Sequence, residues 1–321
     1  MNLYKYDKAF LEQKAKETGF VRDNLEKVYR LTDVLMYLNT NPNLSERLVL
    51  KGGTAINLTV FNMPRLSVDI DLDFNGNCNR EEMLEARKII GDNILAYMKA
   101  NGYTQMADKS KTPHSLDSWV FAFTNSAGNN DNIKVEINYS MRNHVLPIRI
   151  ADVDVDFLPN KFKVRTLAAQ ELFGSKIKAL MERTAARDMY DVCNLIDFGV
   201  FDESEQEMLR KCAVFYHAVG STKEFNELIG IKHFEQLTFN KVKRTLIPVI
   251  RKGEYFDLEA TKKKVGDYIT ELMQITEPEQ EFLHKFADGI YEPELVFDDD
   301  EILERIRNHP MAIWKTSQMN K

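Results

Sequence analysis

The sequence has few of the features that mark disulfide-stapled or membrane-spanning proteins. Its 321 residues include three cysteines, Cys78, Cys193 and Cys212, which form neither a CxxC pair nor a Cys/His metal pattern. We therefore expect free thiols in a reducing compartment, without disulfides or zinc. No apolar run approaches the roughly 18 residues needed to cross a bilayer, and the N-terminus shows no apolar signal core. These absences predict a soluble, unexported, cytoplasmic protein without membrane contact.

An excess of positive charge is also missing. The chain has 43 Lys and Arg against 49 Asp and Glu, which gives a net charge of −6. Many nucleic-acid-binding proteins carry a strong positive field, but a local basic patch can attract a polyanion on a negative protein. Charge therefore does not exclude RNA. Proline-rich tracts, glycine-rich tracts and repeats are absent, and 44% of the residues are hydrophobic. This composition predicts a compact protein, with a length that suits two domains.

The first part of the chain alternates between helix and strand patterns. Apolar residues at three- and four-residue steps across 21–38 predict an amphipathic helix. Residues 48–51 predict a short strand that ends in the Gly52-Gly53 turn. Residues 54–61 have helical character, and the alternating stretch 68–74 predicts a second strand.

The later elements separate into two regions. Asn79, followed three residues on by Glu82, predicts a capped helix that runs to about Ala100. Further strands are expected over residues 118–124, 132–139, 153–158 and 162–165. Beyond Leu167 the pattern is helical. We therefore expect an α+β fold, with a small mixed sheet in an N-terminal domain of residues 1–165 and an all-helical domain of residues 166–321.

Three carboxylates are expected on one face of the second strand. Side chains alternate along a strand, so Asp69, Asp71 and Asp73 share a side. Two unit charges about 4 Å apart repel by about 4 kcal/mol near a protein surface, so a cation would stabilise the row. Mg²⁺ is usually held by one or two carboxylates together with substrate phosphates. Glu136, on another predicted strand, is the best candidate for a third carboxylate and a second Mg²⁺ ion.

The turn before this strand favours a catalytic interpretation. Gly52 and Gly53 would let backbone N–H groups approach phosphates closely, and Thr54 adds a hydroxyl at a helix start. A double glycine alone is more often an ordinary turn, and a lone Asp-x-Asp pattern is more often a solvated strand face. The turn, the helix and the carboxylate strand in this order are much more specific for a catalytic site than the double glycine or the Asp-x-Asp pattern alone. Together they predict a Mg²⁺-dependent NTP site.

Two separated motifs resemble those of a known family. Residues 51–58, KGGTAINL, and 65–72, RLSVDIDL, resemble the opening motif of the AbiEii/AbiGii toxins, which are polymerase-β-like nucleotidyltransferases. Residues 176–183, KIKALMER, and 187–192, RDMYDV, are similar to the family's lysine and Arg-Asp-x-Tyr-Asp motifs. Residues 134–136, KVE, are similar to its Lys-x-Asp strand, with Glu in place of the usual Asp. The resemblance covers about residues 48–196.

The resemblance implies a polymerase-β-like nucleotidyltransferase that acts as the toxin of a type IV toxin–antitoxin or abortive-infection system in phage defence. It implies an NTP donor, Mg²⁺ as cofactor and a tRNA 3′ end as acceptor. It also implies a separate winged-helix antitoxin that forms no stable complex with the toxin. The expected catalytic residues are Asp69, Asp71, Glu136 and Asp188, with the metal at the first three. The expected nucleotide-binding residues are Lys51, Gly52, Gly53, Thr54, Lys176, Arg187 and Asp191.

The second motif also makes chemical sense from its residues. On one continuous helix, Lys176, Arg183, Arg187 and Asp191 would fall within about 80° of one another. Lys176 could bind phosphates, and Asp188 or Asp191 could orient it or act as general base. A helix break at residues 184–186 would remove this shared face and place Asp188 at a helix start. A solvated face with ion pairs is the alternative interpretation.

Other charged runs are expected to be exposed helix faces, including residues 241–244 and 262–264. The histidines show no paired ligand spacing. Two further functions stay open. A nucleotidyltransferase could act on a protein or a small molecule, or the fold could serve as a catalytically silent binding module.

Overall fold

The structure is a computed structural model that describes residues 7–225 and 231–319. The chain divides into two compact units. The sheet unit comprises Met1–Arg142, Ile148–Leu167 and Pro248–Glu254, and the helical unit comprises Asn143–Pro147, Ala168–Ile247 and Tyr255–Lys321. The chain therefore passes between the two units five times.

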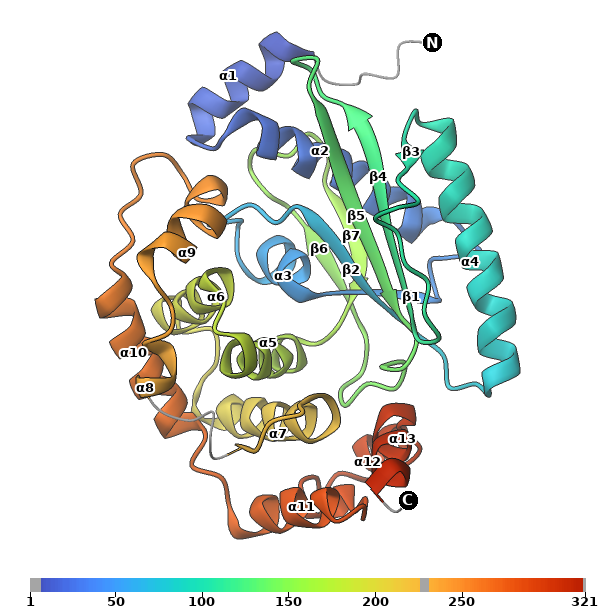
Figure 1. Cartoon of the computed structure of the whole chain (residues 1–321), viewed down its shortest axis with the longest axis vertical. Helices are drawn as coiled ribbons and strands as arrows, with labels where there is room; N and C mark the ends of the chain where they lie inside the picture. Colours follow the sequence, from blue (N-terminus) through green and yellow to red (C-terminus); the bar gives the residue numbers. More distant parts are fainter. Residues whose placement is uncertain (1–6, 226–230, 320–321) are drawn as a thin grey trace. The chain divides into compact units, whose positions relative to one another are not determined.

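The sheet unit is built on a seven-stranded mixed sheet with the strand order β3-β4-β5-β2-β1-β7-β6 (Figure 1). The central strand β2 runs antiparallel to β1 and parallel to β5. The strands are β1 Leu48–Lys51, β2 Asp69–Phe74, β3 Thr104–Gln105, β4 Leu116–Thr124, β5 Asn130–Asn138, β6 Arg149–Val153 and β7 Phe162–Thr166. The α+β class expected from the sequence is confirmed.

The helices of the sheet unit follow the predicted patterns, except for α1, which the sequence analysis did not predict. They are α1 Lys8–Thr18, α2 Arg22–Thr40, α3 Gly52–Ala55, the π-helical turn η1 Ile56–Val60, and α4 Arg80–Ala100. The apolar stripe of α2 is buried, and α2 contacts β5 and β7. Asn79 and Glu82 form the predicted capping box of α4, and Gly102 continues beyond the helix at φ +80°.

One strand expected from the alternation is misplaced. The edge strand is β6 Arg149–Val153, so the prediction of residues 153–158 is wrong apart from Val153. Residues 154–161 form the connection to β7, where Lys161 pairs with Asp154 at 2.6 Å. The carbonyl of Phe157 accepts a hydrogen bond from the Tyr29 hydroxyl of α2 at 2.8 Å. The alternating apolar residues of this stretch pack the connection against the rest of the unit and form no strand pairs in the sheet.

The helical unit has no strand in the portion that the structure describes. Its elements are α5 Ala169–Arg183, α6 Ala186–Asp197, α7 Glu203–Gly220, α8 Ile231–Phe234, α9 Phe239–Thr245, α10 Leu258–Leu272, α11 Glu277–Ala287, the 3-10 turn η4 Pro293–Leu295, α12 Asp300–Ile306 and α13 Pro310–Met319. The 3-10 turn η3 Ile247–Val249 follows α9. Helices α5 and α7 pack closely at Gly174, where an added Cβ would lie 2.6 Å from the Cβ of Cys212.

A buried carboxylate holds the short segment Asn143–Pro147 in the helical unit. Glu171 of α5 is fully buried and accepts hydrogen bonds from the backbone N–H groups of Val145 and Leu146 at 2.9 and 3.0 Å. The Tyr216 hydroxyl donates to the same carboxylate.

Among the described residues, no helix has the length and apolar character that crossing a membrane requires.

Candidate active site

The acidic face of β2 is assembled from three neighbouring strands. Asp71 is paired with Lys51 of β1 on one side and with Glu136 of β5 on the other, while Asp69 is paired with Lys134 of β5. Directly paired residues project to the same side of a sheet. The expectation that Glu136 lies beside the Asp-x-Asp strand is therefore met.

Like charge accumulates around Asp71. Its pKa is raised above the ordinary value, first by burial and then by the negative charges of Asp69 and Glu136, while Lys51 and Lys134 oppose the shift. In the part of the chain that the structure describes, neither Asp69 nor Asp71 has a Lys or Arg within ion-pair distance. A bound cation would offset this repulsion, so the pair fits the oxygen ligands that Mg²⁺ prefers.

Glu136 and Asp73 have lysine partners. Lys134 Nζ lies 2.6 Å from a carboxylate oxygen of Glu136, and Lys51 Nζ lies 2.5 Å from Asp73. Asp73 is 2% exposed, and burial raises its pKa to about 6 although Lys51 opposes the shift. No group of three or more His, Cys, Asp and Glu side chains in the described residues is arranged to hold a metal ion. A metal here would be held by Asp69, Asp71 and oxygen atoms of the substrate.

The turn between β1 and α3 lies directly against Asp71. Gly52 has φ +67°, a left-handed conformation that favours glycine, and an added Cβ would lie 2.7 Å from Asp71 Oδ2. Thr54 is 1% exposed, and its hydroxyl donates to the Asp69 carbonyl and lies at hydrogen-bond distance, 2.9 Å, from Ser67 Oγ, whose hydroxyl can donate to it. Thr54 therefore ties the turn to the chain around β2, while Gly52 lets the backbone approach the carboxylate.

Arg65, in the connection between η1 and β2, is a buried residue beside this turn for which the sequence predicted no role. It is 2% exposed, and its guanidinium donates to the Leu66 carbonyl at 3.0 Å. An added Cβ on Gly53 would lie 2.7 Å from Arg65 Nη2. The second glycine therefore leaves room for the guanidinium of Arg65. The only feature of the sequence that pointed to Arg65 was its place inside the family motif.

The second predicted cluster lies in the helical unit, on two helices. Helix α5 ends at Arg183, Thr184 adopts the left-handed conformation at φ +47°, and α6 begins at Ala186. The interpretation as one continuous helix is wrong, and the alternative break at residues 184–186 is confirmed. Asp188 stands in the first turn of α6.

The helix break still brings the charged side chains together. Lys176 Nζ lies 2.8 Å from Asp188 and 3.1 Å from Asp191, and Arg183 Nε lies 2.7 Å from Asp188. Lys176 is 7% exposed, and both aspartates are more deeply buried. We call these four side chains the lysine cluster. Arg187 lies next to it and donates from Nε to the Thr245 carbonyl at 2.7 Å.

The electrostatics of the lysine cluster bear on whether Asp188 acts as a general base or orients Lys176. Burial alone would raise its pKa, but the charge of Lys176 and the hydrogen bond from Arg183 outweigh burial and lower the pKa to about 2. A carboxylate with so low a pKa is a weak general base near neutral pH. Asp188 is therefore suited to orienting Lys176.

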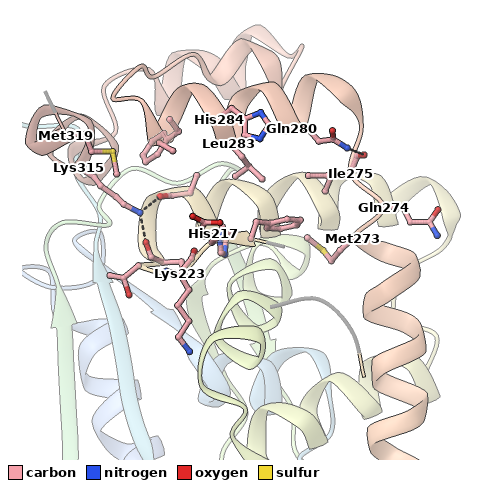
Figure 2. A pocket seen from close by; sticks show the side chains of 17 residues that line it. His217, Lys223, Met273, Gln274, Ile275, Gln280, Leu283, His284, Lys315 and Met319 are labelled. Atoms are coloured by element: carbon pink, nitrogen blue, oxygen red, sulfur yellow. Dashed lines mark hydrogen bonds between the residues drawn. The ribbon is translucent and has the colours of Figure 1, made fainter. Parts of the chain in front are cut away.

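A separate pocket of about 850 Å³ lies within the helical unit (Figure 2). Its wall includes His217 of α7, His284 of α11 and Lys315 of α13. Lys315 Nζ donates to the Ala218 and Ser221 carbonyls at 2.6 and 2.5 Å. Burial, followed by the charge of Lys315, lowers the pKa of His217 to about 4. Among the described residues, the lysine cluster contributes no side chain to this wall.

Comparison with known proteins decides the family. The family model of the nucleotidyl transferase AbiEii toxin, of type IV toxin–antitoxin systems, matches residues 34–271. The chain belongs to the AbiEii family. It is thus a nucleotidyltransferase of a toxin family, as the motifs around Gly52 and Lys176 indicated. No curated protein matches this AbiEii chain.

A solved structure supports the fold of this AbiEii protein along nearly its full length. The chain is similar to MenT4, a nucleotidyltransferase toxin from Mycobacterium tuberculosis H37Rv, with a TM-score of 0.61 and 16% sequence identity. The match covers 96% of this chain and 99% of MenT4. At this identity the likeness shows the shared fold.

Proposed function

We propose that this AbiEii protein transfers nucleotides from an NTP to the 3′ end of a structured RNA, with tRNA as the first candidate, in a Mg²⁺-dependent reaction. The observation that carries the proposal is the position of Asp71. It shares a face of β2 with Asp69, is paired with Glu136 of β5, carries a raised pKa, and lies against the Gly52 turn. Such a concentration of negative charge is costly unless a cation binds.

Each residue group has a proposed task. Asp69 and Asp71 hold Mg²⁺, with Glu136 as the additional carboxylate if a second ion binds. Mg²⁺ bound there would favour ionisation of the acceptor hydroxyl and offset charge on the leaving pyrophosphate. The turn at residues 51–54 supports the triphosphate, and Lys176 binds phosphate with Asp188 and Asp191 orienting its ammonium group.

The proposed biological role follows from the family. The enzyme would act in the cytoplasm as a toxin that blocks translation, and a separate winged-helix antitoxin would neutralise it without a stable complex. Its place in abortive infection and phage defence rests on the same family membership. Expression without the antitoxin should stop growth, whereas expression of Asp71→Asn should not.

The decisive experiment incubates the purified protein with each labelled NTP, Mg²⁺ and total cellular RNA, and then sequences the RNA 3′ ends. We expect Asp69→Asn and Asp71→Asn to lose more than about a hundredfold in transfer rate because each removes a metal ligand and keeps the side-chain shape. Asp73→Asn should lose less, since Asp73 pairs with Lys51.

Two results would contradict the proposal. Near-normal transfer by folded Asp71→Asn would remove the proposed metal site. Labelling of a protein or a small molecule, while RNA gains no nucleotide, would replace the RNA acceptor with one of the other acceptor classes.

A further inference from the structure

The basic side chains of α9 differ from other lysine runs of the helical unit. On α10, Lys262 pairs with Glu259, Lys263 with Asp267, and Lys264 with Asp197, all within 3.0 Å. Helix α9 carries Lys241, Lys243 and Arg244, and in the described part of the chain none of them pairs with a carboxylate. The charge of the α10 run is neutralised locally, whereas among residues 7–225 and 231–319 the α9 cations have no carboxylate partner, and Lys241 donates to the Gln236 carbonyl at 3.3 Å.

The sequence around α9 concentrates this charge on an exposed surface. Residues 236–247 contain no Asp or Glu. Every residue of α9 is exposed except Val242, which is fully buried and anchors the helix. Phe239 is 57% exposed and lies four residues before Lys243, so the two share a side of the helix. An aromatic ring next to unpaired cations is typical of surfaces that bind single-stranded nucleic acid.

Helix α9 lies beside the lysine cluster. Arg187 of α6 donates to the Thr245 carbonyl at the end of α9. Gln236, which precedes α9, donates to Thr184 Oγ1 in the turn between α5 and α6 at 2.9 Å. Helices α6 and α9 are in contact, as Figure 1 shows. The unpaired cations are thus carried next to the helix that bears Asp188 and Asp191.

We propose that α9 binds the phosphate backbone of the RNA acceptor through Lys243 and Arg244, with Lys241 beside them and Phe239 stacking on an unpaired base. This inference rests on the proposed function, since it requires an RNA acceptor. A protein of net charge −6 can attract a polyanion only through a local positive surface. Helix α9 supplies such a surface within the helical unit, and RNA is recognised mainly through phosphate, 2′-hydroxyl and stacking contacts.

The test compares two double variants of the full-length chain that remove the same charge. Lys243→Gln/Arg244→Gln removes two unpaired cations from α9, and Lys263→Gln/Lys264→Gln removes two paired cations from α10. Each phosphate contact contributes about 0.7 to 0.9 to the slope of log affinity against log salt. We therefore expect the α9 variant to reduce that slope by about 1.5 and to raise the KM for RNA about tenfold at low salt.

Three further readouts make the assignment specific. The kcat at saturating RNA, the affinity for NTP measured by calorimetry and the melting temperature should stay close to those of the wild type in both double variants. Phe239→Ala should weaken binding of a single-stranded 3′ end more than binding of a blunt duplex, because only an unpaired base can stack.

The outcomes separate this inference from the proposed function. If the wild type extends RNA but the two double variants show equal KM and salt slopes, α9 does not bind the acceptor and the inference alone fails. If the wild type modifies no RNA, the proposed acceptor and this inference fail together. If the α9 variant keeps its RNA kinetics but escapes neutralisation by the antitoxin, α9 is a protein-binding surface and the inference is wrong.

Discussion

Lys176 is a buried charged residue, so its substitution affects the stability of the fold as well as phosphate binding. The ammonium group is 7% exposed and lies between two carboxylates that are themselves buried. Truncation of such a lysine removes the ammonium group from both buried carboxylates and leaves Arg183 as the cation beside Asp188, and breaking a buried ion pair in this way costs about 3–5 kcal/mol of folding free energy. An alanine variant would therefore confuse loss of phosphate binding with loss of fold.

The sharper variant is Lys176→Met, which removes the same charge but keeps the length of the side chain, so that no cavity adds to the loss of stability. We expect its affinity for a non-hydrolysable NTP with Mg²⁺ to fall about tenfold or more, because one charge-assisted phosphate contact is lost. Calorimetric titration measures the affinity, and a melting curve checks the fold. Lys178→Met is the matched control, since Lys178 pairs with Glu182 and donates to the Gly220 carbonyl. Equal affinity in folded Lys176→Met and wild type would refute the assignment.

His217 predicts an acid-sensitive fold. Its pKa is lowered to about 4 in the folded state, against about 6.5 in the unfolded chain, so folding favours the neutral ring. The resulting stability is fully present above pH 6.5 and is lost as pH falls from 6.5 towards 4. At pH 5 the loss should be about 2 kcal/mol relative to pH 7.

Urea unfolding at pH 7 and pH 5 measures this loss, and His217→Gln is the comparison. The variant has no imidazole to protonate, so its stability should fall less between the two pH values. An equal fall in wild type and variant would show that other groups cause the acid sensitivity.

At the scale of elements, the turn between β1 and α3 places backbone against a carboxylate. Gly52→Ala would add a methyl group 2.7 Å from Asp71 Oδ2 on a residue with φ +67°. We expect a loss of about 1–2 kcal/mol in stability from the left-handed backbone. Displacement of Asp71 should in addition lower the transfer rate more than about tenfold, because metal and substrate positions tolerate little movement.

Gly128 supplies the matched control for this turn. It also has a positive φ, +86°, but an added Cβ would meet no atom within 4 Å. Gly128→Ala should therefore cost a similar amount of stability and leave the transfer rate unchanged. If both variants keep full activity, the turn at Gly52 does not position Asp71 for catalysis.

At the scale of the whole molecule, the segment Pro248–Glu254 belongs to the sheet unit although it follows α9 in the chain. The Val249 carbonyl accepts from Leu66 N–H at 2.8 Å, and Lys252 N–H donates to the Gly19 carbonyl at 2.7 Å. Asn24 donates to the Pro248 carbonyl at 2.7 Å. The expected boundary at residues 165–166 would separate this segment from its partners.

A fragment that ends at Leu167 should therefore be less stable than the same fragment with Pro248–Glu254 attached through a flexible linker. Each of the lost hydrogen bonds contributes about 1 kcal/mol, so a difference of a few kcal/mol is expected. Thermal unfolding followed by circular dichroism measures it. Identical melting temperatures would show that the sheet unit folds independently of the returning segment.

Local signals in the sequence predicted most elements, because a helix or strand pattern depends on neighbours along the chain. The stripe of α2, the strands β1 and β2 and the capping box of α4 all follow from nearby residues. The misplaced edge strand shows the limit of this approach, since apolar alternation does not distinguish pairing from packing. Arg65 was missed because a buried arginine and an exposed one look the same in sequence.

The sequence by itself determined the carboxylate face of β2, the glycine turn before it and the family, because strand alternation and motif order are local properties. Only the tertiary structure decided which charges are neutralised. It placed lysines beside Asp73 and Glu136, left Asp69 and Asp71 without a basic partner among the described residues, and closed the lysine cluster across a helix break. Lys134 and Glu136 already share a face through alternation along one strand, but the other contacts join residues that are far apart in the chain or that face each other only after the helices pack, and Coulomb interactions depend on distance in space.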